Sequence, residues 1–218
     1  MDMRIAGKGN VPSGEYENIK ISGKGHLYGN VRCVSFKSSG TSKGESIECL
    51  ERFKASGSSA FTGNIKAKYI RASGSLSCVA SEENKAENNI KCDDLSVSGS
   101  LKIDGNIEAE NVKIAGSLKC TGLINAENIM LSADKVMNVG SIGGTNILIK
   151  RKPISAFKRR TVVQSSIEGD NIKVKYVTCP LVTGRNVKIG RGCKIDLVQY
   201  SDTIEISRSA KIGKIEKI

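Results

Sequence analysis

The sequence predicts an all-β fold in which the chain winds into a triangular β-solenoid built from 17-residue coils. Small residues recur at this interval, apolar and polar residues alternate between them, and no segment has the apolar spacing of an amphipathic helix. The recurring small residues are Gly23, Gly40, Gly57 and Gly74, followed by Gly99, Gly116 and Ala133. Because the interval from Gly74 to Gly99 is eight positions longer than the others, we expect an insert loop over residues 80–87.

Each coil contains three pairs of apolar residues, and the members of a pair are two positions apart. Leu101 and Ile103 form one such pair, which is the spacing of a strand with one face turned inward. Small or turn-forming residues separate the pairs, and we expect them at corners because Gly and Asn tolerate positive φ. Three strands and three corners make a triangular coil. Equivalent residues should then stack, as in the serine column Ser58, Ser75, Ser100 and Ser117.

The repeat divides the chain into two predicted solenoid segments. The main β-helix covers residues 1–149, a basic linker or loop covers 150–166, and a second, shorter β-helix covers 167–218. In the second segment Val187 and Ile189 recur one repeat later as Ile204 and Ile206. The sequence leaves open whether this segment lies on the first stack or beside it.

Composition excludes several classes of protein. The net charge of +12 is uneven, because residues 1–149 hold 18 basic and 16 acidic residues, whereas residues 150–218 hold 16 and 6. With four Phe, five Tyr and no Trp, we expect an aliphatic core. Seven cysteines without a C-x-x-C pair disfavour a disulfide framework or a zinc site and predict buried free thiols in a reducing cytoplasm. We expect no signal peptide and no transmembrane helix.

Two consecutive coils carry a family resemblance. They are G-S-L-K-I-D-G-N-I-E-A-E-N-V-K-I-A from Gly99 to Ala115 and G-S-L-K-C-T-G-L-I-N-A-E-N-I-M-L-S from Gly116 to Ser132. With the 17-residue repeat, they resemble the bactofilins, the polymer-forming cytoskeletal proteins of bacteria. The resemblance implies a right-handed parallel β-helix that stacks end to end into filaments without nucleotide. It further implies a cytoplasmic scaffold at the inner face of the membrane, serving cell shape, cell wall or motility, with itself, a related bactofilin, or envelope and cell-wall proteins as partners.

An open solenoid has unpaired strand edges and an apolar cross-section at its two ends, which favours self-stacking. The candidate polymerisation residues are Ile5, Val11, Ile212, Ile215 and Ile218. The alternative from another class is a solenoid adaptor that binds a protein partner and does not polymerise.

The residues provide no enzyme site. The single histidine, His26, occupies an outward position, and acidic side chains are interspersed with lysines, which is typical of a solvated surface. We therefore expect no catalytic residue, cofactor, metal or small-molecule substrate. An acyltransferase-like β-helix enzyme remains a remote alternative, since those enzymes use strict six-residue repeats.

A basic segment forms the one localised functional signal. Its candidate residues for contact with an anionic membrane are Lys150, Arg151, Lys152, Phe157, Lys158, Arg159 and Arg160. Clustered cations beside apolar residues favour a peripheral contact with anionic lipid. Nucleic acid is disfavoured there because only Phe157 could stack on a base. A solvated loop remains the alternative.

Overall fold

The structure is a computed structural model that describes residues 1–80, 88–152 and 160–218. Every regular element in these ranges is a β-strand, and the strands pair in parallel as stacked coils, so the predicted β-solenoid is confirmed. The chain forms two compact units, unit 1 (Met1–Ala109) and unit 2 (Glu110–Ile218). Each unit is described by itself below.

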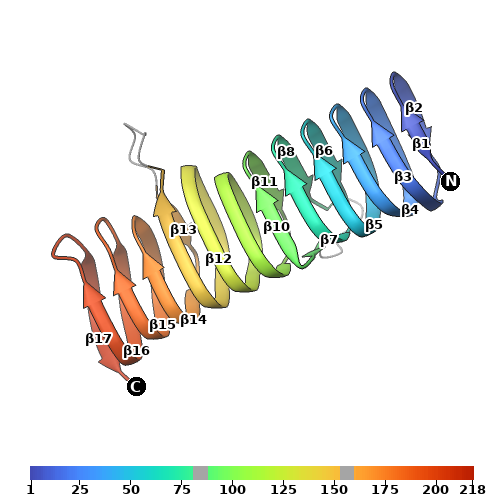
Figure 1. The fold of residues 1–218 in the computed structure, drawn as a ribbon. Coiled ribbons are helices and arrows are strands. Elements are labelled where there is room, and N and C mark those ends of the chain that lie inside the picture. The colour runs from blue at the N-terminus through green and yellow to red at the C-terminus, as the bar shows by residue number, and fades with distance from the viewer. Residues whose placement is uncertain (81–87, 153–159) are drawn as a thin grey trace. The chain divides into compact units, whose positions relative to one another are not determined.

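Unit 1 is built from eleven short to medium strands and the start of a twelfth, and successive coils lie side by side in Figure 1. The strands are β1 (Met3–Ile5), β2 (Lys8–Val11), β3 (Gly14–Ile21), β4 (Lys24–Ser38), β5 (Thr41–Ala55), β6 (Ser58–Phe61), β7 (Ile65–Ala72), β8 (Ser75–Cys78), β9 (Ile90–Lys91), β10 (Asp94–Val97), β11 (Ser100–Ile103) and β12 (Ile107–Arg151).

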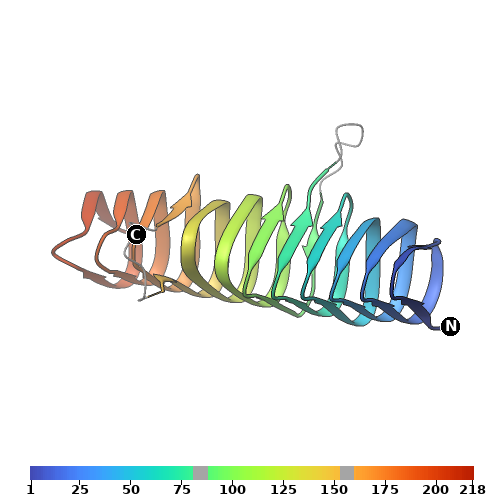
Figure 2. The ribbon, with the colours of Figure 1, turned by 90° about the horizontal axis from the view of Figure 1, so that it is seen from above.

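Unit 2 contains most of β12 and five further strands, whose coils are seen from above in Figure 2. These strands are β13 (Thr161–Val163), β14 (Ser166–Val174), β15 (Val177–Ile189), β16 (Lys194–Ile206) and β17 (Lys211–Lys217).

Pairing between β4 and β5 shows the three sides of a coil. The register begins with Lys24 opposite Thr41, the residue one repeat later, and it shifts between Leu27 and Asn30 and again between Cys33 and Ser35. The two shifts separate three runs of parallel pairing, each short enough to be one side of the coil. Three paired runs per coil agree with the predicted triangular winding.

The insert falls where the sequence predicts it. Ser75 pairs with Ser100 and Ile65 pairs with Ile90, and both offsets exceed the usual repeat by eight positions. The additional residues of this longer coil lie between Cys78 and Ile90, and positions 81–87 are outside the described part. Ser58, Ser75 and Ser100 also stack as expected, since each lies directly opposite the next.

The recurring glycines have a different cause from the one predicted. A Cβ atom on Gly40 would lie 1.9 Å from the carbonyl oxygen of Gly23, and one on Gly57 would lie 2.0 Å from that of Gly40. Neither residue has positive φ. Gly40 and Gly57 are needed because the backbone of the preceding coil passes too close for any side chain, so the predicted positive φ is wrong at these two corners. It is confirmed at Gly29, with a φ of 64°, and at Gly116, with a φ of 148°.

The core of unit 1 is mostly aliphatic, with Tyr16 and one cluster of phenylalanine rings. The Phe36 and Phe53 rings stack with centroids 4.9 Å apart, and Phe61 meets Phe53 edge-on at 5.7 Å. Each ring is 1% exposed. Gly44 provides space, because a Cβ there would lie 3.2 Å from the Phe61 ring. The expectation of a core without large rings was therefore wrong locally: glycine in one coil allows a ring in the next.

Unit 2 shows where the residues after the basic segment stack, which the sequence left open. Ile142 pairs with Ile167 and Ile149 with Val174, so the residues after the basic segment lie directly on the coil before it. The next coil is shorter, since the offset from Ile172 to its partner Val187 is two positions less than the repeat, and the full repeat returns between Val187 and Ile204. The predicted boundaries at 149/150 and 166/167 stay a prediction.

A ladder of asparagine side chains runs along one side of unit 2. Each amide nitrogen donates to the side-chain oxygen of the preceding asparagine at 3.0 Å, and Thr203 donates to the last asparagine at 2.7 Å. The asparagines are Asn111, Asn128, Asn146, Asn171 and Asn186. Side-chain amides on neighbouring strands form hydrogen bonds with one another, and these bonds fix the register of successive coils.

Candidate functional site

The coil formed by β16 and β17 exposes apolar side chains that equivalent positions elsewhere bury. Ile195 and Val198 are at most 1% exposed, whereas their partners on β17, Ile212 and Ile215, are half-buried and 48% exposed respectively. Ile218 is 64% exposed. β17 pairs with β16, and no strand of the described residues pairs with its other edge. An apolar surface therefore lies beside a row of free backbone donors and acceptors.

The other two predicted contact residues lie inside unit 1. Val11 is 0% exposed and Ile5 is 8% exposed. Nearby, Tyr16 is 9% exposed and its hydroxyl donates to the Pro12 carbonyl oxygen at 3.0 Å. Ile5 and Val11 therefore present almost no side-chain surface, whereas Ile212 and Ile215 on β17 and Ile218 directly after it are half-buried or exposed.

The basic segment is described only at its two edges. Lys152 lies 3.8 Å from the Asp134 carboxylate, and Arg160 donates to the Thr178 hydroxyl at 3.5 Å. Lys150 is exposed. Phe157, Lys158 and Arg159 lie outside the described residues, so their predicted membrane contact stays a prediction.

Arg151 takes part in a cluster that the sequence did not indicate. Its guanidinium carbon lies 4.0 Å from the centroid of the Tyr176 ring, and that of Arg191 lies 5.6 Å from the same centroid. Tyr176 has a φ of 58°, and Gly192, with a φ of 74°, leaves room for the ring, because a Cβ there would lie 2.5 Å from it. Cation–π contacts thus hold Arg151 against the solenoid. A single tyrosine between Lys175 and Val177 has no spacing that could have revealed this cluster.

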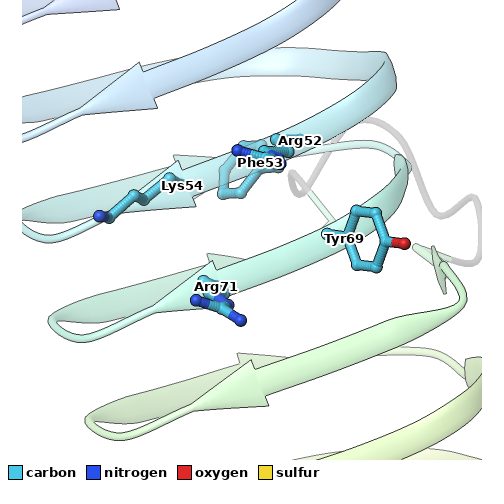
Figure 3. A pocket seen from close by; sticks show the side chains of 5 residues that line it. All are labelled: Arg52, Phe53, Lys54, Tyr69 and Arg71. Atoms are coloured by element: carbon cyan, nitrogen blue, oxygen red, sulfur yellow. The ribbon is translucent and has the colours of Figure 1, made fainter.

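A shallow hollow of about 280 Å³ lies on unit 1 between β5 and β7. Figure 3 shows its lining on two successive strands, with Arg52 and Lys54 on one and Tyr69 and Arg71 on the other. The lining holds cations and a tyrosine ring but no carboxylate. These groups can attract an anion.

The remaining reactive side chains are isolated or buried. His26 is exposed, as predicted, and stacks on Tyr28 with ring centroids 4.2 Å apart. All seven cysteines are free and buried, as predicted. Burial, with Asp104 nearby, raises the pKa of the Cys78 thiol to about 12, and burial similarly raises the pKa of Cys92 to about 12. Within the described ranges, no three His, Cys, Asp or Glu side chains gather in a way that could hold a metal ion.

Within residues 1–80, 88–152 and 160–218, no helix is long and apolar enough to cross a membrane.

Comparison with known proteins gives one partial similarity. Part of the chain is 32% identical over 85 residues to a protein of Bacillus subtilis (strain 168) named uncharacterized protein YhbF. The similar stretch covers 38% of this chain and 36% of that protein, so the chain spans about a third of this relative. No family model matches the chain, and no solved structure matches it.

Proposed function

We propose that this chain is a bactofilin-like scaffold protein that self-assembles end to end into filaments without nucleotide. The observation that carries the proposal is the surface formed by Ile212, Ile215 and Ile218 beside the unpaired edge of β17. Docking of another solenoid coil on this edge would bury these side chains and would complete the backbone pairing. Contacts between two different surfaces of the same chain lead to filaments when the rotation between successive copies does not close a ring.

The regular stacking of unit 2 supports this geometry. The strands from β14 to β17 all pair in parallel, so a further coil would pair with the free edge of β17 in the arrangement that the preceding strands already use, although the asparagine ladder ends at Thr203 on β16. Each methylene buried at such a contact contributes about 0.8 kcal/mol. Assembly of this kind needs no bound nucleotide, because its driving forces are apolar burial and strand pairing.

Negative-stain electron microscopy of the purified chain without nucleotide tests the proposal. We expect filaments from the wild type and none, or short ones only, from Ile215→Lys, because a lysine there places a charge in the contact. Leu50→Lys is the matched control, since Leu50 is 61% exposed and lies on β5 of unit 1, away from β17 in the sequence, and it should leave the filaments intact.

Single particles from the wild type would contradict filament formation and would favour the solenoid adaptor. Filaments of unchanged length from Ile215→Lys would place the assembly contact elsewhere on the chain.

A further inference from the structure

One side of unit 1 carries an unbroken row of like charges, which we name the cation row. Its members lie directly opposite one another on successive coils, so their backbones are about 4.8 Å apart and the row is about 19 Å long. They are Arg4, Lys20, Lys37, Lys54 and Arg71. All five are exposed, and none has a side-chain ion pair or hydrogen bond within the part of the chain that the structure describes. The row ends at the next coil, where Ser96 lies opposite Arg71.

A second row of charged residues, on another side of unit 1, shows that the fold does not require every residue of a row to carry the same charge. This ion-pair row consists of Glu15, Arg32, Glu48, Lys66, Lys91 and Glu108. Arg32 lies 3.1 Å from Glu48, Lys66 lies 2.9 Å from Glu48, and Lys91 lies 3.0 Å from Glu108. The ion-pair row satisfies its charges within the chain, whereas like charges directly opposite one another in the cation row repel. Within the described residues the cation row therefore has no ion-pair partner, and an external anion can supply one.

The shape of the row selects the kind of anion. The neighbouring column on the same side holds Asn18, Ser35, Arg52 and Tyr69, with Asp2 beside Asn18 at one end and Asp94 opposite Tyr69 at the other, so the cations lie in single file with one added arginine. A single file of charges matches a linear polyanion better than it matches a bilayer, whose charges spread in two dimensions. The half-buried Tyr69 ring lies in the hollow with Lys54 and Arg71 (Figure 3), and Lys68 Nζ lies 5.6 Å from its centroid. An aromatic ring in such a cationic hollow can stack on a base.

We propose that the cation row binds the phosphodiester backbone of single-stranded nucleic acid without reading its sequence, and that Tyr69 stacks on one base. Lysine and arginine bind phosphates by releasing condensed counterions, and this process depends on charge and not on base identity. The site is distinct from the basic segment at residues 150–160, and it is independent of the proposed filament contact.

Fluorescence anisotropy of labelled oligo-dT with the full chain tests the proposal as a function of salt. Five phosphate contacts predict a slope of log Kobs against log[salt] of about −3.5. Lys37→Gln with Lys54→Gln removes two contacts, so it should reduce the slope by about 1.4 and weaken binding at low salt at least about tenfold. Lys66→Gln with Lys91→Gln is the matched control, because it removes the same charge from the ion-pair row and should change the affinity less than about twofold.

Two further probes separate base stacking from charge attraction and nucleic acid from a membrane surface. Tyr69→Ala should weaken oligo-dT binding about fivefold or more while leaving inorganic polyphosphate binding unchanged, because polyphosphate has no base to stack. Anionic phosphatidylglycerol vesicles serve as the competing surface. Equal weakening by the two double variants, or no binding of oligo-dT at low salt, would overturn the proposal. Binding of vesicles but not oligo-dT, lost only in Lys37→Gln with Lys54→Gln, would overturn it in favour of a membrane contact.

Discussion

The carbonyl oxygen of Gly40 lies 2.0 Å from the position that a Cβ atom on Gly57 would occupy. This distance is far inside van der Waals contact, and the neighbouring group is backbone that cannot rotate away. Gly57→Ala must therefore displace one coil from the next. We expect a loss of about 1–3 kcal/mol in the free energy of unfolding, measured by urea denaturation.

Gly7→Ala is the matched control for this substitution. Gly7 occupies the equivalent corner of an earlier coil, since Lys24, which follows Gly23, donates its amide to the Gly7 carbonyl oxygen, but a Cβ on Gly7 would meet nothing within 4 Å. We expect its effect to stay within about 0.5 kcal/mol. Equal losses in the two variants would show that the close approach of the coils does not explain the glycine repeat.

Phe53 lies between two other rings, and its removal should be among the most damaging substitutions in unit 1. It stacks on Phe36 and meets Phe61 edge-on, and its side chain is 1% exposed. Phe53→Ala leaves a cavity in a rigid stack, so we expect a cost of about 3–5 kcal/mol in urea denaturation. Tyr28→Ala, at a residue that is 46% exposed, should cost much less, and similar costs would contradict a cooperative aromatic core.

Much of this fold follows from the sequence, because a solenoid converts sequence spacing directly into spatial neighbourhood. The repeat interval between Val187 and Ile204 is visible in the sequence and is the register of β15 on β16. The interval between paired residues changes at some corners. Asn30 pairs with Ser46, one position short of the repeat, and Ile47 pairs with Ile65, one position beyond it. The apolar alternation on the straight sides was therefore predictable, whereas features that depend on corner geometry were not.

The candidate functional residues, like the fold, were predictable only in part. Ile215 was identifiable because it continues an apolar column, but the burial of Val11 depends on how the first coil closes near Tyr16. The cation row and the Phe36–Phe53 stack were both readable in the sequence, because Lys37 and Lys54, like Phe36 and Phe53, are 17 positions apart, but neither column was predicted.

The stability of unit 1 should depend on pH through Glu48. Its hydrogen bond with Lys66, together with the nearby Arg32, holds the pKa of Glu48 below its ordinary value. A lowered pKa stabilises the fold above the pKa of the unfolded chain, and this contribution disappears as the pH falls through the folded value. Glu48→Gln should therefore destabilise the protein by up to about 1 kcal/mol at neutral pH and by nothing in strong acid. A difference from wild type that stays constant with pH in thermal denaturation would contradict this assignment.

The cysteines should be unreactive in the folded chain. Burial raises the pKa of Cys179 to about 11, and the other six thiols are buried as well. Because the thiolate is the nucleophile, we expect almost no reaction of the native protein with a disulfide reagent at pH 8. All seven thiols should react after unfolding in guanidinium chloride. Rapid reaction of native protein would show that these coils open readily in solution.

Sedimentation velocity of the wild-type chain, without nucleotide and over a wide range of concentration, tests the central claim of end-to-end assembly most directly. The exposed surface around Ile215 predicts a sedimentation coefficient that rises steadily with concentration, and Ile215→Lys should abolish this rise. A single 23.3 kDa species at every concentration would contradict the claim.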